Sequence, residues 1–210
     1  NINNNVLTLN SGLNAFHWGE LQYATASGMS LSSASVLTPS LPTPTILDER
    51  ASVANLTRNI VIQSADDAHW NNQGFGAHTV IMPNSTAHVE GVQFIRAGQS
   101  GRLRRYAFHW HMLSYSGSST LADATGQYLR NSTIQQSANR GVVIHGTNGL
   151  LIQNNVLYDI RGHAIFTEDA VERRNTIDGN LVLYVRNPIN GTELKPHEAG
   201  NFGSSGFWIS

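Results

Sequence analysis

The chain has 210 residues and a formal net charge of −1, and only 13% of its residues are charged against 40% that are hydrophobic. This length suits one domain of all-β type, and a composition with 19 glycines and so few charges favours turns and strands over surface helices, which excludes a helical bundle. The near-neutral charge gives no reason to expect nucleic acid as a partner. No apolar run reaches the roughly 20 residues of a membrane-spanning helix, and the absence of cysteine excludes disulfides.

The first 45 residues differ in composition from the rest of the chain. They are rich in Ser, Thr, Leu and Pro and end in Leu41–Thr45 (LPTPT), a stretch that is extended and poorly helical because of its prolines. From about Arg58 onward, short β-branched runs are closed by Asn, Gly, Asp or Ser, which is typical of strands separated by tight turns. We therefore predict an extended or capping segment over 1–45 and a β-helix domain over 46–210.

A repeat runs through the second part of the chain. Placing Leu129 over Leu151 gives an offset of 22 residues (151 − 129), and placing Ile152 over Ile177 gives 25 (177 − 152). The same rhythm occurs earlier, in Ile60–Ser64 and His88–Phe94. Such spacing suits one coil of a parallel β-helix, in which each strand pairs with the same strand of the next coil. We predict an all-β, right-handed, single-stranded parallel β-helix; a β-sandwich would show strands about 8 to 12 residues apart and hairpin dipeptides.

The repeat also predicts what individual residues do within each coil. Ile134, Val156 and Leu181 should stack as an apolar ladder that points into the core. The tight or left-handed backbone of a turn, which Asn and Gly adopt most cheaply, is expected at Asn154, Asn155, Gly179 and Asn180.

One interval is too long for a single coil. Phe94 and Leu129 lie 35 residues apart (129 − 94), so we predict an insertion around 112–127 with its tip in the polar stretch Ser114–Thr120. Loops of this kind on a rigid scaffold commonly shape a binding cleft. The basic run Arg102, Arg104 and Arg105, just before it, is interpreted as a solvated face.

Four histidines are the most pointed chemical feature of the sequence. His109 and His111 alternate on one strand, so both imidazoles project to the same face while Phe108 and Trp110 face the core. His145 follows 34 residues after His111 (145 − 111), an offset that the insertion explains. His163 lies level with Val142 in one register, which puts it in the core, and with Val143 in the other, which puts it in the site.

Together, His109, His111, His145 and His163 are candidate ligands of zinc or a similar divalent transition metal. The alternative is that each histidine has a separate structural role. Glu168 and Asp169 are the nearest acidic residues, but adjacent strand residues point to opposite faces, so they are not expected to act as a simple acid and base pair; one of them could face the cleft while the other caps a turn.

Over about two thirds of its length, from Leu47 to Val185 with a weaker echo at Phe207–Ile209, the chain resembles a β-helix family that includes fibrocystin, the cell-migration-inducing hyaluronidase and the transmembrane cell-surface hyaluronidase. The strings that carry the resemblance are ERASV at Glu49–Val53, LTRNIVIQ at Leu56–Gln63, Gly98–Gln99 with Gly101–Leu103, RYAFHWHM at Arg105–Met112, NRGVVIHGT at Asn139–Thr147, LIQNNVLYD at Leu151–Asp159 and GHAIFTED at Gly162–Asp169.

The resemblance implies an extracellular or cell-surface location and leaves two functions open. In the first, the domain binds an acidic polysaccharide such as hyaluronan and depolymerises it as a hydrolase or a lyase. In the second, it is a non-catalytic structural or adhesion module of a larger surface or secreted protein, and its histidines are structural or hold a metal ion.

The first function assigns roles to particular residues. The catalytic candidates are His109, His111, Glu168 and Asp169, with hydrolysis through either acid or elimination through a base such as a histidine or Tyr106. The expected substrate-binding residues are Arg105, Tyr106, Arg140 and Arg161, the arginines through bidentate pairing with uronate carboxylates.

Overall fold

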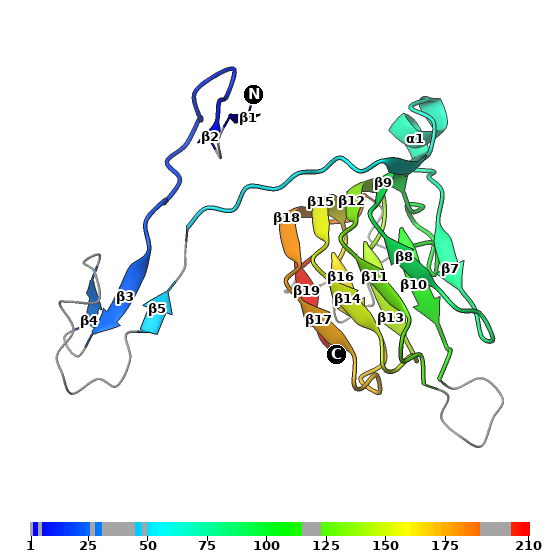
Figure 1. Cartoon of the computed structure of the whole chain (residues 1–210). Helices are drawn as coiled ribbons and strands as arrows, with labels where there is room; N and C mark the ends of the chain where they lie inside the picture. Colours follow the sequence, from blue (N-terminus) through cyan, green and yellow to red (C-terminus); the bar gives the residue numbers. More distant parts are fainter. Residues whose placement is uncertain are drawn as a thin grey trace. The chain divides into compact units, whose positions relative to one another are not determined.

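The computed structural model describes residues 2–3, 6–25, 28–30, 45–47, 50–114, 123–189 and 203–210. The chain forms two compact units, Asn1–Val53 and Ala54–Ser210. In the first, β1 (Ile2–Asn3) pairs with β2 (Val6–Leu7), and β3 (Gln22–Thr25) lies between β4 (Gly28–Ser30) and β5 (Thr45–Leu47), all antiparallel (Figure 1). Because β5 pairs with β3, residues 45–47 belong to this unit, whereas the change of composition placed the boundary after residue 45.

The second unit is built from three parallel sheets, each of which takes one strand from every coil. Sheet 1 contains β7 (Thr79–Ile81), β10 (Phe108–His111), β13 (Val142–His145), β16 (Ile165–Thr167) and β19 (Phe207–Trp208). Sheet 2 contains β8 (His88–Glu90), β11 (Tyr128–Arg130), β14 (Leu151–Gln153) and β17 (Thr176–Asp178). Sheet 3 contains β6 (Ile60–Gln63), β9 (Val92–Ala97), β12 (Thr133–Ser137), β15 (Val156–Arg161) and β18 (Leu181–Arg186).

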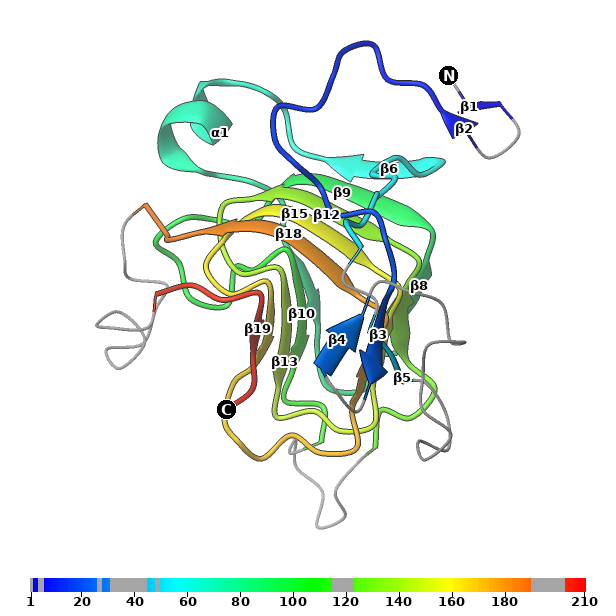
Figure 2. The ribbon, with the colours of Figure 1, turned by 90° about the vertical axis from the view of Figure 1, so that its left-hand side faces the viewer.

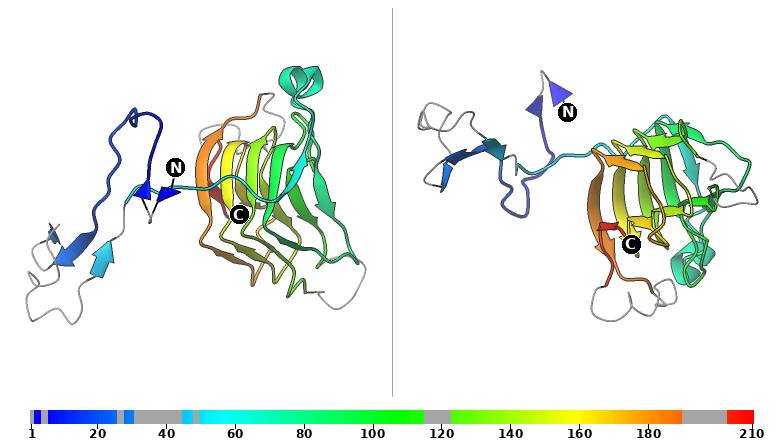
Figure 3. Two further views of the ribbon diagram at one scale, coloured as in Figure 1. Left: turned by 45° about the horizontal axis from the view of Figure 1, so that its top comes forward. Right: turned by 90° about the horizontal axis from the view of Figure 1, so that it is seen from below.

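The chain visits sheets 1, 2 and 3 in turn and then returns to sheet 1 one coil further along (Figures 2 and 3). All strand pairs of this unit are parallel, which confirms the predicted parallel β-helix and rules out a sandwich of hairpins. A short helix, α1 (Ala68–Gln73), lies between β6 and β7; within the described residues, no helix is long and apolar enough to cross a membrane.

The register differs from the prediction by one residue in one pair of coils. The offset of 25 is confirmed, since Ile152 pairs with Ile177 and Val156 with Leu181. The offset of 22 is wrong, because Leu129 pairs with Ile152, an offset of 23 (152 − 129). Leu150, Leu151 and Ile152 are all apolar, so the residue type alone does not tell which of them pairs with Leu129. In the structure Ile152 does, and it is fully buried, whereas Leu151 is half-buried.

A slip of one residue exchanges the two faces of a strand. The ladder that points inward is therefore Ile134, Leu157 and Val182, while Val156 is only half-buried. Ile134 and Leu157 have no exposed surface at all, and Val182 packs against the same core.

The turns between sheets 2 and 3 depend on Asn and Gly, as predicted. Asn154 and Gly179 have φ angles of 53° and 61°, in the left-handed region. Asn155 and Asn180 act through their side chains instead: Nδ2 of Asn155 donates to the Leu129 carbonyl at 2.8 Å, and Nδ2 of Asn180 donates to the Ile152 carbonyl at 2.8 Å. Each asparagine thus links its own coil to the preceding one, and Asn180 Oδ1 also accepts from the Asn155 backbone at 3.0 Å.

The corner between sheet 1 and sheet 2 varies in length from coil to coil. It comprises residues 82–87, 112–127, 146–150 and 168–175 in successive coils, so the second corner is at least twice as long as any other. This long corner is the stretch expected to be an insertion; of its expected tip, Ser114 is described and 115–120 lie outside the described residues.

We predict that Leu157→Asp will prevent stable folding, because it places an unpaired charge in a fully buried position of β15, at a cost of several kcal/mol against a total stability of about 5 to 15 kcal/mol. Tyr158→Asp is the matched control, since Tyr158 is the next residue of the same strand and is 37% exposed. Urea unfolding followed by circular dichroism measures both. Equal stability of the two variants would contradict the assigned register.

Candidate functional site

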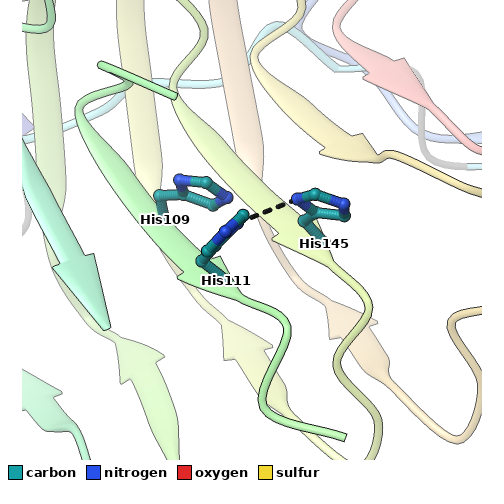
Figure 4. A group of neighbouring side chains, drawn as sticks. All are labelled: His109, His111 and His145. Carbon is teal, nitrogen blue, oxygen red and sulfur yellow. Dashed lines mark hydrogen bonds between the residues drawn. The ribbon is translucent and has the colours of Figure 1, made fainter. Parts of the chain in front are cut away.

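Three histidines meet on the outer face of sheet 1. His109 and His111 alternate on β10 and point away from the core, while Phe108 and Trp110, both buried, fill the inside as predicted. β13 pairs with β10 so that His145 lies directly beside His111. Figure 4 shows the three rings gathered over these two strands.

The three imidazoles are close enough to act on one atom. Nδ1 of His111 lies 3.0 Å from Nδ1 of His145, and each residue offers a ring nitrogen within 4.8 Å of those of the other two. His109 has no exposed surface, and neither of its ring nitrogens makes a hydrogen bond of normal geometry among the described residues, although the Arg104 backbone lies near the ring. Unpartnered polar atoms at such depth are rare in native structures.

The environment keeps two of these rings neutral. Burial, followed by the neighbouring His111 and His145, lowers the pKa of His109 to about 3, and the nearby Arg104 backbone only partly opposes this. Burial and then His145 also lower the pKa of His111, against a smaller opposing effect of Asp169. At neutral pH both rings are therefore uncharged, with a lone pair on one nitrogen.

Two adjacent acids contact the same histidine. Nε2 of His145 lies 2.7 Å from the Asp169 carboxylate, and its Nδ1 lies 3.6 Å from that of Glu168. The sequence predicted that these acids would point to opposite faces, which is wrong because both follow the end of β16 at Thr167 and the alternation of a strand no longer applies.

Arg140 and Tyr106, expected to bind substrate, are instead buried beneath the site. Both have no exposed surface. Nη1 of Arg140 donates to the Tyr106 hydroxyl at 3.1 Å and lies 4.0 Å from the Glu168 carboxylate, while its guanidinium lies 4.0 Å from the centre of the Phe166 ring. Burial raises the pKa of Tyr106, which makes it a poor base. These contacts position Glu168 and leave no surface of Arg140 or Tyr106 for a polymer.

His163 is not brought into the cluster. Neither register considered for it is right: Val142 pairs with Ile165, which puts His163 level with Arg140. Its ring stacks on Phe166 with the centroids 5.2 Å apart, and its Nδ1 accepts a hydrogen bond from the Ser205 backbone at 3.2 Å. Arg161 lies on sheet 3 and lines a separate pocket, next to Asp159.

A pocket of about 360 Å³ opens beside the histidines over β7 and β10. Its lining includes His78, Leu103, Arg104, Arg105, His109 and His111. Of these, Arg105 was predicted as a binding residue, whereas Arg104 was assigned to a solvated face and His78 to no site. The sequence does contain a signal for these two pocket residues. Arg104 belongs to the basic run Arg102–Arg105, and His78 directly precedes β7, the strand that pairs with β10.

We predict that the metal-free chain loses stability as the pH falls from about 6.5 toward 3. In the unfolded chain His109 has its ordinary pKa of about 6.5, whereas in the folded chain it is about 3, so between these values the unfolded state binds the proton and the folded state does not. The free energy of unfolding is therefore about 3 kcal/mol lower at pH 4 than above pH 6.5. Urea unfolding in the presence of a chelator measures this, with His109→Gln as the comparison. The prediction is wrong if the two proteins show the same dependence on pH.

Residues 74–207 match the family described as CEMIP beta-helix. The chain is 32% identical to human fibrocystin-L over 186 residues, covering 71% of this chain and 4% of that protein. It is 37% identical to human cell surface hyaluronidase CEMIP2 over 153 residues, covering 67% of this chain and 11% of that protein. A G8 domain-containing protein of Dictyostelium discoideum is 34% identical over 151 residues, covering 72% and 10%.

The chain thus corresponds to a small part of each of these much longer relatives. The matched family region contains the pocket and all three clustered histidines, together with sheets 1 and 2 and most of sheet 3. The predicted resemblance is confirmed, and the chain belongs to the CEMIP β-helix family.

Proposed function

We propose that this chain is an extracellular carbohydrate-binding β-helix domain that holds an acidic polysaccharide of the hyaluronan type in the pocket over β7 and β10. The observation that carries the proposal is the lining of this pocket, in which Arg104 and Arg105 stand exposed at the surface and no described lining residue is acidic. A guanidinium pairs with the planar carboxylate of a uronic acid through two parallel hydrogen bonds.

Other features of the pocket suit a sugar chain. Val80, Met82 and Leu103 give it apolar walls, which suit the C–H faces of a pyranose ring. Arg105 contacts the ring of His78, and this contact, after burial, lowers the pKa of His78, so the positive charge here comes from the arginines. The name of one relative, cell surface hyaluronidase CEMIP2, supports an acidic glycan as the ligand and the cell surface as the location.

Cleavage of the polymer is a separate step, for which the accessible acid is Asp169. The Asp169 side chain is 41% exposed and accepts a hydrogen bond from Nε2 of His145, whereas the Glu168 side chain is only 12% exposed and lies beside Arg140. The two candidate catalytic histidines, His109 and His111, also line the pocket, and both rings are neutral. The alternative is a non-catalytic structural or adhesion module of a larger surface protein, in which the histidines are structural or hold a metal ion.

We predict that replacing both Arg104 and Arg105 by Ala will weaken binding of hyaluronan oligosaccharides at least about 100-fold, because hydrogen bonds to charged groups contribute about 1.5 to 3 kcal/mol each and both guanidinium groups are removed. Isothermal titration calorimetry measures the affinity. Arg174→Ala is the control, since Arg174 is exposed, pairs with Asp123 and does not line the pocket. A neutral dextran should not bind.

An equal loss in Arg174→Ala, or equal binding of dextran, would overturn the proposal. The same samples, incubated with long hyaluronan and run on size-exclusion chromatography, separate the two functions. A shift of the polymer to later elution that Asp169→Asn abolishes indicates cleavage, and binding without a shift indicates a binding module.

A further inference from the structure

We propose that His109, His111 and His145 form a binding site for one divalent transition-metal ion of the zinc class. This goes beyond polysaccharide binding and does not depend on it. The three rings come from adjacent strands of two coils, and their ring nitrogens lie within 4.8 Å of one another. Such convergence is what a metal with nitrogen ligands requires.

The burial of His109 is the second, independent observation. Its side chain has no exposed surface, yet neither ring nitrogen makes a hydrogen bond of normal geometry among the described residues, and only a weaker contact with the Arg104 backbone favours a proton on the ring. Burial of a polar group without a partner is unfavourable, and native proteins satisfy nearly all such groups. A metal ion would satisfy one ring nitrogen of His109 and leave the proton on the other, where the Arg104 backbone favours it; the His109 ring lies 5.0 Å from that of His111 and 6.0 Å from that of His145 between centroids.

The hydrogen bond to Asp169 orients the third ligand. With Nε2 of His145 2.7 Å from the Asp169 carboxylate, the proton belongs on Nε2, which leaves the lone pair on Nδ1. That nitrogen faces Nδ1 of His111 at 3.0 Å. Two imidazole nitrogens on one tetrahedral zinc lie about 3.4 Å apart, given Zn–N distances of about 2.0 to 2.1 Å, so a small separation of the rings opens the site.

A carboxylate that holds the far side of a ligating imidazole is the usual support of a zinc site. The fourth coordination position faces Glu168, whose carboxylate lies 3.6 Å from Nδ1 of His145 and is positioned by Arg140. Three nitrogens and one carboxylate suit zinc, cobalt or nickel, whereas calcium and magnesium require mostly oxygen ligands.

The test uses the whole chain, purified without a histidine tag, treated with a chelator and titrated with zinc sulfate by calorimetry. We expect one zinc ion per chain. His111→Ala and His145→Ala, both at half-buried positions, should weaken zinc binding at least 100-fold, and Asp169→Asn about 10- to 100-fold. His69→Ala, at a histidine of α1 whose side chain is 70% exposed, should bind as the unaltered chain does.

Two further readouts make the result independent of folding defects and of the polysaccharide. Cobalt should give the intense visible absorption of a tetrahedral complex in the unaltered chain and not in His111→Ala, while circular dichroism shows that both remain folded. Zinc should raise the thermal midpoint of the unaltered chain and of His69→Ala, but not that of His111→Ala. The proposal fails if the chelated protein takes up no zinc, if His111→Ala binds it as tightly, or if His69→Ala removes binding.

Discussion

The parallel pairing of successive coils, residue on residue, is the constraint on which the rest of this structure depends. A side chain on sheet 1 has its neighbours chosen by register, because the same position of the coil before and the coil after lies beside it. From the pairings of β10, β13 and β16, three columns follow on the outer face. The paired residues His109, Val143 and Phe166 form one column, and the pair His111 and His145 begins a second, beside which Glu168 follows with its N–H donated to the Ile144 carbonyl. Extending the same register backward puts Tyr106, Arg140 and His163 level with one another. This pairing alone brings the three histidines together, whereas the acids and the arginines of the pocket come from the connections between strands.

The same constraint explains a buried arginine. Arg140 is held between the rings of Phe166 and Tyr106, and its charge is shared with the Tyr106 hydroxyl and Glu168. An arginine can be buried where its guanidinium has both flat aromatic contacts and polar partners. Arg140 thereby links the buried cluster of Tyr106, Val143 and Phe166 on this face to Glu168, one of the two acids that contact His145.

Stacking also maintains unusual backbone in four of the five strands of sheet 3. One position of β9, β12, β15 and β18 has a positive φ angle without being glycine; these residues are Arg96, Gln136, Asp159 and Tyr184. Each such residue costs roughly 1 to 2 kcal/mol in isolation. The flanking pairs on both sides, such as Tyr158 with Leu183 and Ile160 with Val185, hold the bend in place.

The parallel β-helix was predictable because the rhythm of apolar residue, polar residue and Asn or Gly returns once per coil. The convergence of His109, His111 and His145 was predictable too, since alternation on one strand and the offset to the next coil are visible in the sequence. The burial of Arg140 and His163 was not predictable. The residues next to Arg140 in the sequence do not indicate that Phe166 covers it, and those next to His163 do not determine its register. The pocket escaped prediction because Arg104 reaches the histidines only through the path of the chain between β9 and β10.

The corner after each strand of sheet 1 begins directly after His111 and His145, and at Glu168 itself, and its length can change while the strands before and after it stay in register. A family with this fold can therefore lengthen or shorten the chain beside its histidines without refolding anything. Evolution of ligand preference in such a scaffold is separable from evolution of stability. A comparison of relatives that keep these histidines but differ in the length of the corners would therefore show how the surroundings of the site affect its ligand preference.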